Sequence, residues 1–302
     1  MTTRDVHDEE PVIVIKPRAP YTITPHLKQF TLKNRPTPCI YDEESRSCAR
    51  LVTWGVEEEV AYEATILSEG WEPLIKIHVI RGPPETAVKI VKHVLNTDYV
   101  YPDTSTIIEI CPGLGRMIEE YPGLRPALNP SMWESLVKAI VNQQLPIHLA
   151  LRITSKLVER LGEKISISKN RTLYGFPTPL KVLDAGAEKL RNIGLSRRKA
   201  EYVIGIAEAI VRQGYDLEKI GGLPPGRAID ELVGLRGVGP WTAKLAYMAY
   251  TGNLDIFLPE DLAVRRGLRL AVCRKELISK TTSYAGLISY LAAALYELSK
   301  KT

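Results

Sequence analysis

The sequence predicts an α+β protein in which an N-terminal antiparallel β-sheet domain is followed by a mainly α-helical bundle. β-Branched and alternating residues, interrupted by Gly and Pro, fill residues 21–80. After about residue 105, apolar residues recur at helical spacing and several of the expected helices end in Gly. At 302 residues the chain is long enough for two such domains.

The composition is that of an ordinary globular protein, with 45% hydrophobic and 25% charged residues. No run approaches about eighteen consecutive apolar residues, and the N-terminus lacks the apolar segment of a signal peptide. We therefore expect a cytoplasmic, prokaryotic protein that does not contact a membrane. The formal net charge of +5 permits binding to nucleic acid without requiring it.

The four cysteines, Cys39, Cys48, Cys111 and Cys273, are scattered along the chain and form no C-x-x-C pair. This spacing argues against a clustered zinc or iron–sulfur site and suits a reducing cytosol. A Cys39–Cys48 disulfide is an alternative that the spacing does not favour, and Cys273 is expected to stand alone. Gln is scarce beside plentiful Glu and Lys, which leans towards a thermophilic source.

Residues 1–20 are charged and contain Pro, so we expect a flexible N-terminus. The β-rich domain is expected over residues 21–105, with strands in YTITPHLKQFTL, ARLVTWGVEEEVAYEATIL and PLIKIHVI. Two prolines followed by apolar residues at helical spacing predict a helix over residues 83–95, after the strands.

The helical domain is expected over residues 106–302. Ser131 is a candidate N-cap, and Glu134 three residues later completes a capping-box pattern. Further helices are predicted in HLALRITSKLVERLG, PLKVLDAG, EKLRNIG, SRRKAEYVIGIAEAIVRQG and TSYAGLISYLAAALYELSKK. The stretch RAIDELVGLRGVGPWTAKLAYMAYTG predicts two helices joined by a very short turn.

That turn contains the candidate binding site for a nucleic-acid backbone. Gly237 and Gly239 flank Val238 and permit a positive φ and close backbone approach. The amides at the start of the second helix are unpaired and lie at the positive end of the helix dipole, a combination that favours phosphate. Turn carbonyls could also hold a monovalent cation, and the candidates are those of Val233, Leu235 and Val238. A lone G-x-G, however, often does no more than turn a helix pair.

Asp261 is the candidate catalytic carboxylate. It lies 20 residues after Trp241 in DIFLPEDLAVRRGL, where a helix is expected to begin. Asp near a helix N-terminus is an ordinary cap, but the same position helps to keep a carboxylate ionised. Cleavage of a glycosidic bond needs such a group, because the sugar develops oxocarbenium character. Glu260 is the alternative carboxylate.

The hairpin followed at this distance by F-L-P-acid-Asp resembles the helix-hairpin-helix-Gly/Pro-Asp DNA glycosylase superfamily, and within it the 3-methyladenine DNA glycosylase II type. Residues 121–144, 176–210 and 283–291 resemble further segments of that family, so the resemblance covers roughly residues 20–300. It implies that Asp261 is the catalytic carboxylate of an enzyme that excises alkylated bases from double-stranded DNA after base flipping.

The resemblance also implies the residues of a base pocket. Bifunctional relatives carry a Schiff-base Lys at the position of Trp241, and Trp is unable to form an imine, so hydrolysis without strand cleavage is expected. The indole would stack on an electron-poor alkylated purine, with a core position as the alternative. Tyr290, Trp133 and Gln143 are further pocket candidates, although Trp133 is equally compatible with a core role.

Contacts to the DNA backbone are implied for Gly237, Val238, Gly239 and Lys244. Lys244 is expected to be solvated or to contact a phosphate, and a role as lyase nucleophile is the alternative. Pro126 and Leu128 are the candidates for a wedge that fills the gap left by the flipped nucleotide. Arg197, Arg198 and Lys199 form either a DNA-facing surface or an ordinary solvated one.

Three functions remain open from the sequence. The first is a monofunctional glycosylase for alkylated bases, acting as a monomer without a cofactor other than a structural cation. The second is a glycosylase for another damaged base, such as 8-oxoguanine or hypoxanthine. The third is a non-catalytic helix-hairpin-helix DNA-binding protein, which would have no use for Asp261 or for an aromatic pocket.

Overall fold

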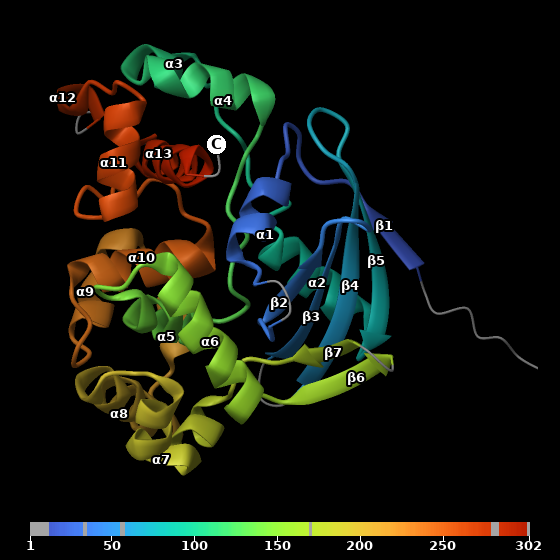
Figure 1. Cartoon of the computed structure of the whole chain (residues 1–302), viewed down its shortest axis with the longest axis vertical. Coiled ribbons are helices and arrows are strands. Elements are labelled where there is room, and N and C mark those ends of the chain that lie inside the picture. Colours follow the sequence, from blue (N-terminus) through green and yellow to red (C-terminus); the bar gives the residue numbers. More distant parts are fainter. Residues whose placement is uncertain (1–11, 33–34, 55–57, 169–170, 279–283, 301–302) are drawn as a thin grey trace, which may run out of the picture.

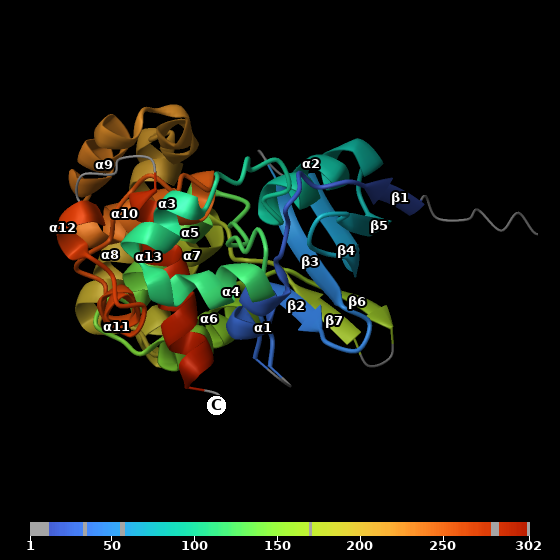
Figure 2. The same cartoon turned by 90° about the horizontal axis from the view of Figure 1, so that it is seen from above.

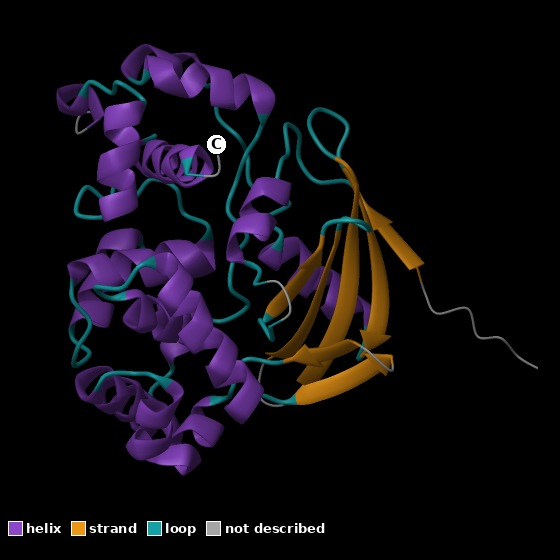
Figure 3. Cartoon of the chain, viewed as in Figure 1, coloured by secondary structure: helices purple, strands orange, loops and turns teal. Residues whose placement is uncertain are grey.

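The computed structural model describes residues 12–32, 35–54, 58–168, 171–278 and 284–300 (Figure 1). An antiparallel sheet stands beside a larger group of helices, which confirms the predicted α+β class (Figure 3). Seen from above, α1 lies between α13 and the sheet (Figure 2). The described residues include no helix long and apolar enough to cross a membrane.

The sheet has the order β1-β5-β4-β3-β2, and every neighbouring pair is antiparallel. Its side chains alternate, so that Ile75, Ile77 and Val79 of β5 are buried while their neighbours are more exposed. Helix α2 (Pro84–Val94), predicted from its prolines and spacing, packs on β4 and β5. The strands are β1 (Val12–Ile15), β2 (Cys39–Asp42), β3 (Ser47–Trp54), β4 (Glu58–Ser68) and β5 (Leu74–Arg81).

Two N-terminal predictions were wrong. Residues Val12–Ile15, expected to be flexible, pair with β5 as an edge strand, while residues 1–11 lie outside the described part. The stretch from Tyr21, expected as a strand, forms helix α1 (Thr24–Phe30). Pro25 occupies the first turn of α1, where its fixed φ and missing N–H favour a helix.

Most of the remaining chain is helical, as predicted. The helices are α3 (Ser105–Ile110), α4 (Gly115–Glu120), α5 (Met132–Asn142), α6 (Ile147–Leu161), α7 (Pro179–Ile193), α8 (Arg197–Gln213), α9 (Pro225–Val233), α10 (Pro240–Thr251), α11 (Leu262–Leu270), α12 (Lys275–Ile278) and α13 (Ala285–Ser299), with 3-10 turns η1 (Pro112–Leu114) and η2 (Leu217–Gly222). The two helices expected around Gly186 form a single kinked element, α7.

A β-ribbon interrupts this helical region, which the sequence analysis did not predict. Strands β6 (Lys164–Ser168) and β7 (Arg171–Tyr174) pair antiparallel and return to the sheet. Leu173 is buried there among apolar residues of β3 and β4, and Arg171 pairs with Glu63 over 2.6 Å. The ribbon therefore attaches the helical region to the N-terminal sheet.

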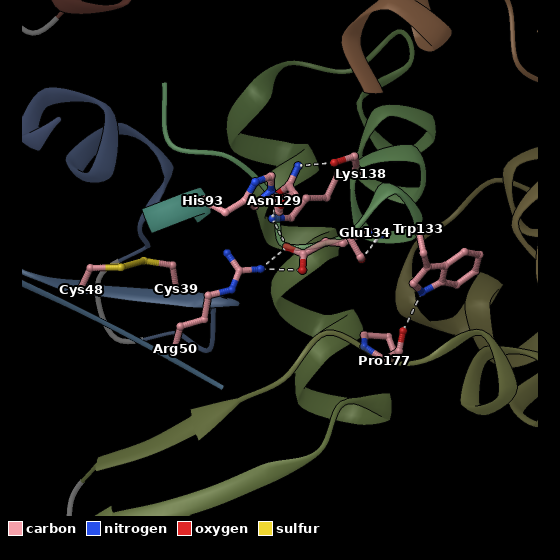
Figure 4. A network of polar contacts seen from close by, with 11 residues as sticks. Cys39, Cys48, Arg50, His93, Asn129, Trp133, Glu134, Lys138 and Pro177 are labelled. Carbon is pink, nitrogen blue, oxygen red and sulfur yellow. Dashed lines mark hydrogen bonds and ion pairs between the residues drawn. A yellow bond between two sulfur atoms is a disulfide. The ribbon is translucent and has the colours of Figure 1, made fainter. Parts of the chain in front are cut away.

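A buried ionic network joins the sheet to α5 (Figure 4). Ser131 caps α5 as predicted. The Glu134 side chain, however, does not return to the cap: it pairs with Arg50 of β3 over 2.5 Å and with Lys138. Lys138 also donates to Asn129 Oδ1 over 2.7 Å. Because Arg50 and Glu134 are 3% and 1% exposed, the network fixes α5 against the sheet.

The cysteines pair, contrary to expectation. Disulfides join Cys39 to Cys48 and Cys111 to Cys273, with Cα atoms 6.2 and 4.1 Å apart. Cys273 therefore does not stand alone. Cys111 and Cys273 are 162 positions apart in sequence, but η1 and the end of α11 lie together, because Gly113 N donates to the carbonyl of Ala271 over 2.9 Å.

Candidate active site

The hairpin between α9 and α10 depends on Gly237. This residue has a φ of +88°, and a Cβ at its position would collide with the ring of Tyr202 on α8. The turn is closed by a hydrogen bond from Val238 N to the carbonyl of Leu235, at 3.1 Å. Both the backbone conformation and the packing therefore require glycine at this position.

Gly239 has a different role from Gly237. It is the exposed N-cap of α10, and a Cβ placed on it would meet nothing within 4 Å. No side chain caps α10 at this residue. Internal packing therefore does not explain this glycine, and the first amides of α10 stay open to an anion from outside.

Gln143 holds the hairpin from behind. Its Nε2 donates to the carbonyl of Gly237 over 2.9 Å and to Thr242 Oγ1 over 3.0 Å. We expected Gln143 in the base pocket, but its amide N–H groups are used to order the turn. Lys199 Nζ in turn donates to the backbone carbonyl of Gln143 over 2.6 Å. Lys199, expected on either a DNA-facing or an ordinary solvated surface, thus helps to fix the end of α5.

Asp261 is the N-cap of α11. Its Oδ1 accepts hydrogen bonds from Ala263 N and Val264 N, at 2.8 and 3.1 Å. These two amides fix the carboxylate at the start of α11. The predicted N-cap is therefore confirmed, and both cap hydrogen bonds go to Oδ1.

Trp241, in the first turn of α10, reaches the second oxygen of this carboxylate. Its indole Nε1–H donates to Asp261 Oδ2 over 3.2 Å, and both side chains are half-buried. Trp241 is predicted from the sequence to stack on a base, with a core position as the alternative. The structure adds a contact with the carboxylate that no local pattern predicts, because residues 20 positions apart meet only through the fold.

Lys244 lies beside the same site. Its Nζ pairs with Glu260 Oε1 over 3.0 Å, and the two side chains are 25% and 42% exposed. Glu260, the alternative carboxylate, therefore has a cationic partner and no contact with the amides that hold Asp261. The geometry favours Asp261 over Glu260 as the reactive carboxylate.

Tyr290 of α13 lies between the helical region and the N-terminal domain. Its hydroxyl is 3.3 Å from Nδ1 of His26 on α1. Burial, and then the charge of Lys138, lowers the pKa of His26 to about 3, so this imidazole is neutral. Burial likewise raises the pKa of Tyr290 well above its usual value. The aromatic pair is thus uncharged at neutral pH.

The loop that leads to Asp261 is tied to α13 close to Tyr290. Leu258 N donates to Ser289 Oγ over 3.3 Å, and Leu287 N donates to the carbonyl of Leu254 over 2.8 Å. Tyr290 and Asp261 are therefore positioned by the same pair of segments. The start of α13 quoted in the sequence analysis includes residue 283, which lies outside the described residues.

With this geometry established, comparison of the sequence matches residues 137–284 to the HhH-GPD superfamily of base excision DNA repair proteins. The matched range includes the hairpin, Trp241 and Asp261. This part of the chain belongs to the HhH-GPD superfamily.

Two relatives of this HhH-GPD protein are named as DNA-3-methyladenine glycosylases. The chain is 24% identical to the DNA-3-methyladenine glycosylase of Bacillus subtilis over 275 residues, which cover 89% of this chain and 88% of that protein. It is 28% identical over 155 residues to DNA-3-methyladenine glycosylase 2 of Escherichia coli, covering 51% of this chain. That second alignment spans about half, 53%, of the relative's own length, as does the match to another Bacillus subtilis protein.

Solved structures share the fold of the HhH-GPD protein along nearly its whole length. A 3-methyladenine DNA glycosylase from Archaeoglobus fulgidus superposes with a TM-score of 0.77 at 26% identity, covering 95% of this chain and 98% of that one. An 8-oxoguanine glycosylase/lyase from Clostridium acetobutylicum bound to DNA gives a TM-score of 0.67 at 16% identity, covering 92% of each chain, and indicates the fold alone.

Two other predicted site residues of the HhH-GPD protein lie in its core. Trp133 is 5% exposed, and its indole donates to the carbonyl of Pro177 over 2.9 Å (Figure 4). Its position corrects the pocket assignment in favour of the core alternative. Leu128, expected as a wedge, is 4% exposed, and its backbone N donates to the carbonyl of Val94. A side chain so buried does not project towards DNA.

The segment around Leu128 has a structural role instead. Arg125 is fully buried and donates to the carbonyls of Gly123, Asn96, Tyr99, Arg18 and Pro20. These bonds join the N-terminal arm to the lead-in of α5. Pro126 follows directly and is half-buried, so its wedge role remains only a prediction.

Gln144 of the HhH-GPD domain was not among the predicted site residues, and its backbone is unusual. It is exposed in the α5–α6 loop and has a φ of +53°, an unusual backbone conformation for a non-glycine residue. The preceding Gln143 is bonded to the hairpin. The two adjacent glutamines do not reveal these features in the sequence, because both the φ angle of Gln144 and the contact of Gln143 depend on the tertiary structure.

Proposed function

We propose that this protein is a monofunctional DNA glycosylase, which removes alkylated bases of the 3-methyladenine type from double-stranded DNA. The observation that carries the proposal is the contact between Trp241 and Asp261 beside an open helix N-terminus. The names of its full-length relatives support the choice of alkylated bases. A non-catalytic DNA-binding module would need the hairpin but not this carboxylate.

The hairpin binds a backbone phosphate of the damaged strand. The exposed amides at Gly239 and the start of α10 supply hydrogen bonds and a positive dipole without reading the base sequence. The damaged nucleotide leaves the stack, because its glycosidic bond is unreachable within the duplex. Gln144, exposed beside the hairpin-holding Gln143, fills the space that it vacates.

Asp261 acts on the sugar of the flipped nucleotide. As the C1′–N bond lengthens, the sugar gains positive charge, which the ionised carboxylate stabilises. The bond electrons leave with the base, and a water adds to C1′ and loses a proton. The amides of Ala263 and Val264 hold Oδ1, so that the carboxylate is preoriented before substrate arrives.

Trp241 orients Asp261 through its N–H and offers its ring face to the base. The two roles are compatible, because the N–H lies in the ring plane and the stacking surface lies above it. A positively charged alkylated purine gains from this electron-rich face. Trp241 forms no imine, and Lys244 is engaged with Glu260, so we propose hydrolysis without strand cleavage.

The carbonyls of Val233, Leu235 and Val238 are the proposed ligands of a structural monovalent cation. Val233 is the last residue of α9, where helix carbonyls lack intrahelical donors, and Leu235 and Val238 follow in the turn. Leu235 O already accepts from Val238 N and retains one lone pair. Such an ion would stiffen the turn. We further propose that the protein acts as a monomer on chromosomal DNA in a prokaryotic cytoplasm.

The direct test is to incubate the protein with methylated duplex DNA and to identify released bases by chromatography. Release of 3-methyladenine with the strand left intact supports the proposal. Preferential release of 8-oxoguanine or hypoxanthine would instead support the alternative specificity. Borohydride reduction during turnover should trap no adduct, and an adduct that disappears in Lys244→Ala would overturn the monofunctional assignment.

A further inference from the structure

The outer face of the N-terminal sheet, opposite α2, is covered over only part of its area. The ribbon of β6 and β7 packs on this face where Leu51, Ala61 and Leu173 form a small apolar cluster. Ile80, near the end of β5, joins that cluster, whereas Leu74, at the start of β5, is exposed. Among the described residues, the ribbon therefore leaves uncovered the part of the face beside the start of β5 (Figure 1).

Three exposed apolar side chains lie on this uncovered part. The register places Val14 of β1 opposite Lys76 of β5, and Lys76 opposite Thr65 of β4, so this row points to one side of the sheet. Leu74 and Leu67 each lie two positions from a member of the row and share its side. Val14, Leu67 and Leu74 are 54%, 47% and 38% exposed. Such a group of exposed apolar side chains is typical of an interaction surface.

Trp71 extends this surface at the turn between β4 and β5, where it is 71% exposed. Tryptophan is enriched among the residues that dominate the energy of protein–protein binding. We call Val14, Leu67, Trp71 and Leu74 the apolar sheet surface. Because much of its apolar area is open to water, covering it with an apolar partner would be favourable.

The dimensions of the apolar sheet surface match one helix. It spans β1, β5 and β4, which together are about 10 Å wide, and a helix with its side chains is about 10–12 Å across. On the inner face, the protein itself places α2 on β4 and β5. A helix is thus the element that already covers the other apolar face of this sheet.

Positive charge accompanies the apolar sheet surface. Lys76 lies within it, opposite Val14, and Lys16 follows β1. Both lysines are exposed, and neither forms an ion pair among the residues that the structure describes. An occupant with carboxylates beside its apolar side chains would therefore complement this surface.

DNA does not fit the apolar sheet surface. The hairpin helices α9 and α10 lie on the opposite side of the molecule from β1 in both views (Figure 1 and Figure 2). The backbone of a nucleic acid is polar and anionic, so it would leave the exposed indole of Trp71 without an apolar partner. A protein helix that combines acidic and apolar residues would match both the lysines and the apolar side chains.

We propose that the apolar sheet surface binds an acidic amphipathic helix of a partner protein. The apolar face of that helix packs on the apolar sheet surface, and the carboxylates at its border pair with Lys16 and Lys76. Because this surface lies away from the hairpin, the partner and DNA bind at the same time. The inference goes beyond the proposed function and does not depend on it.

Fluorescence anisotropy with a labelled peptide and the full chain tests the proposal. The probe is a helical peptide with Leu along one face and Glu on both borders of that face. A second peptide has Lys in place of Glu, and a third is a scrambled version of the first with the same composition. We expect the acidic amphipathic peptide to bind about tenfold or more tightly than either control peptide.

Variants of the protein locate the contact. Val14→Glu/Trp71→Glu should weaken binding of the acidic peptide about tenfold or more, because apolar contacts are lost and like charges are introduced. Lys76→Glu should reverse the preference, so that the Lys-bordered peptide binds more tightly than the Glu-bordered one. Leu180→Glu/Leu270→Glu, at exposed positions of α7 and α11, is the matched control and should bind as wild type does. Melting temperatures close to that of wild type show that each variant is folded.

Failure of the acidic peptide to bind, or an equal loss of binding in the control variant, would overturn the inference. Displacement of the peptide by duplex DNA would also overturn it, because DNA would then be the occupant. Self-association of wild type that disappears in Val14→Glu/Trp71→Glu, measured by analytical ultracentrifugation, would assign the surface to a second copy of the chain and contradict the proposal.

Discussion

The indole N–H of Trp241 donates to Asp261 Oδ2 over 3.2 Å, while two backbone amides of α11 hold Oδ1. The carboxylate is therefore fixed by two helices that begin at the same place in the fold. Helix α10 begins at the hairpin proposed to hold DNA, and α11 begins at the carboxylate. The first turn of α10 therefore connects the proposed phosphate site to the carboxylate of Asp261.

Replacing Trp241 by Phe should separate the two proposed roles of its side chain. Phe keeps an aromatic face but removes the hydrogen bond to a charged group, worth about 1.5–3 kcal/mol. We expect the single-turnover rate of base release to fall about 10- to 100-fold, with DNA affinity within about threefold of wild type. The control is Trp71→Phe, at a remote residue that is 71% exposed. An unchanged rate would show that the hydrogen bond does not position the carboxylate.

Replacing Gln143 by Glu should disorder the hairpin. A carboxylate is unable to donate to the Gly237 carbonyl, which accepts from Gln143 Nε2 over 2.9 Å. We expect the free energy of unfolding to fall by about 1–3 kcal/mol and DNA affinity to weaken. Gln213→Glu, at an exposed position, provides the control. If both variants bind DNA alike, Gln143 has no part in ordering the hairpin.

Glu134 should support stability without taking part in catalysis. Removing its charge in Glu134→Gln leaves Arg50 buried without its counter-ion, which should cost about 3–5 kcal/mol in the free energy of unfolding. Glu208→Gln, which breaks the exposed pair with Arg212, should cost less than about 1 kcal/mol. Urea denaturation at pH 7 measures the free energy of unfolding of both variants. Similar losses in the two variants would contradict the stabilising role assigned to Glu134.

The same network predicts the direction of a pH dependence. Burial by itself raises the pKa of Glu134, but the charges and hydrogen bonds of Arg50 and Lys138 together outweigh burial and lower the pKa below its usual value. The stabilisation is therefore complete above the unfolded-state pKa and is lost as pH falls through the lower folded-state pKa. The stability gap between wild type and Glu134→Gln should stay constant near neutrality and shrink in acid. A gap that widens as pH falls would have the wrong sign.

The disulfide between Cys111 and Cys273 should stabilise the end of α11. It closes a loop of 162 positions, for which chain entropy gives about 5 kcal/mol, against about 3 kcal/mol for the 9-position Cys39–Cys48 loop. We expect Cys273→Ser to lower the melting temperature more than Cys48→Ser. Free thiols titrated in the unfolded, unreduced wild type would contradict both pairings.

Local patterns were sufficient to predict most helices and the order of the domains, because capping residues, prolines and apolar spacing act over a few positions. Ser131, for example, caps its helix as predicted. Helix α1 was mistaken for a strand because the alternation before Pro25 is short, and the ribbon of β6 and β7 was missed inside a helical region.

Both residues of the proposed reactive pair were chosen from the sequence, but their contacts were not predicted. Trp241 and Asp261 were both selected, whereas their hydrogen bond, the pairing of Lys244 with Glu260 and the role of Gln143 behind the hairpin depend on tertiary structure. Trp133 and Leu128 were misassigned for the same reason, since burial decides between core and surface for apolar side chains.

The most direct test of the account is the release of free base from methylated duplex DNA by wild type and by Asp261→Asn. Asn is also a good N-cap, so α11 should begin normally and DNA binding should persist. Asp255→Asn, at an exposed residue of the same loop, is the matched control. We predict release by wild type and Asp255→Asn, and at least a hundredfold slower release by Asp261→Asn, where about 2.7 kcal/mol or more of transition-state stabilisation is lost. Equal rates for wild type and Asp261→Asn would contradict the central claim.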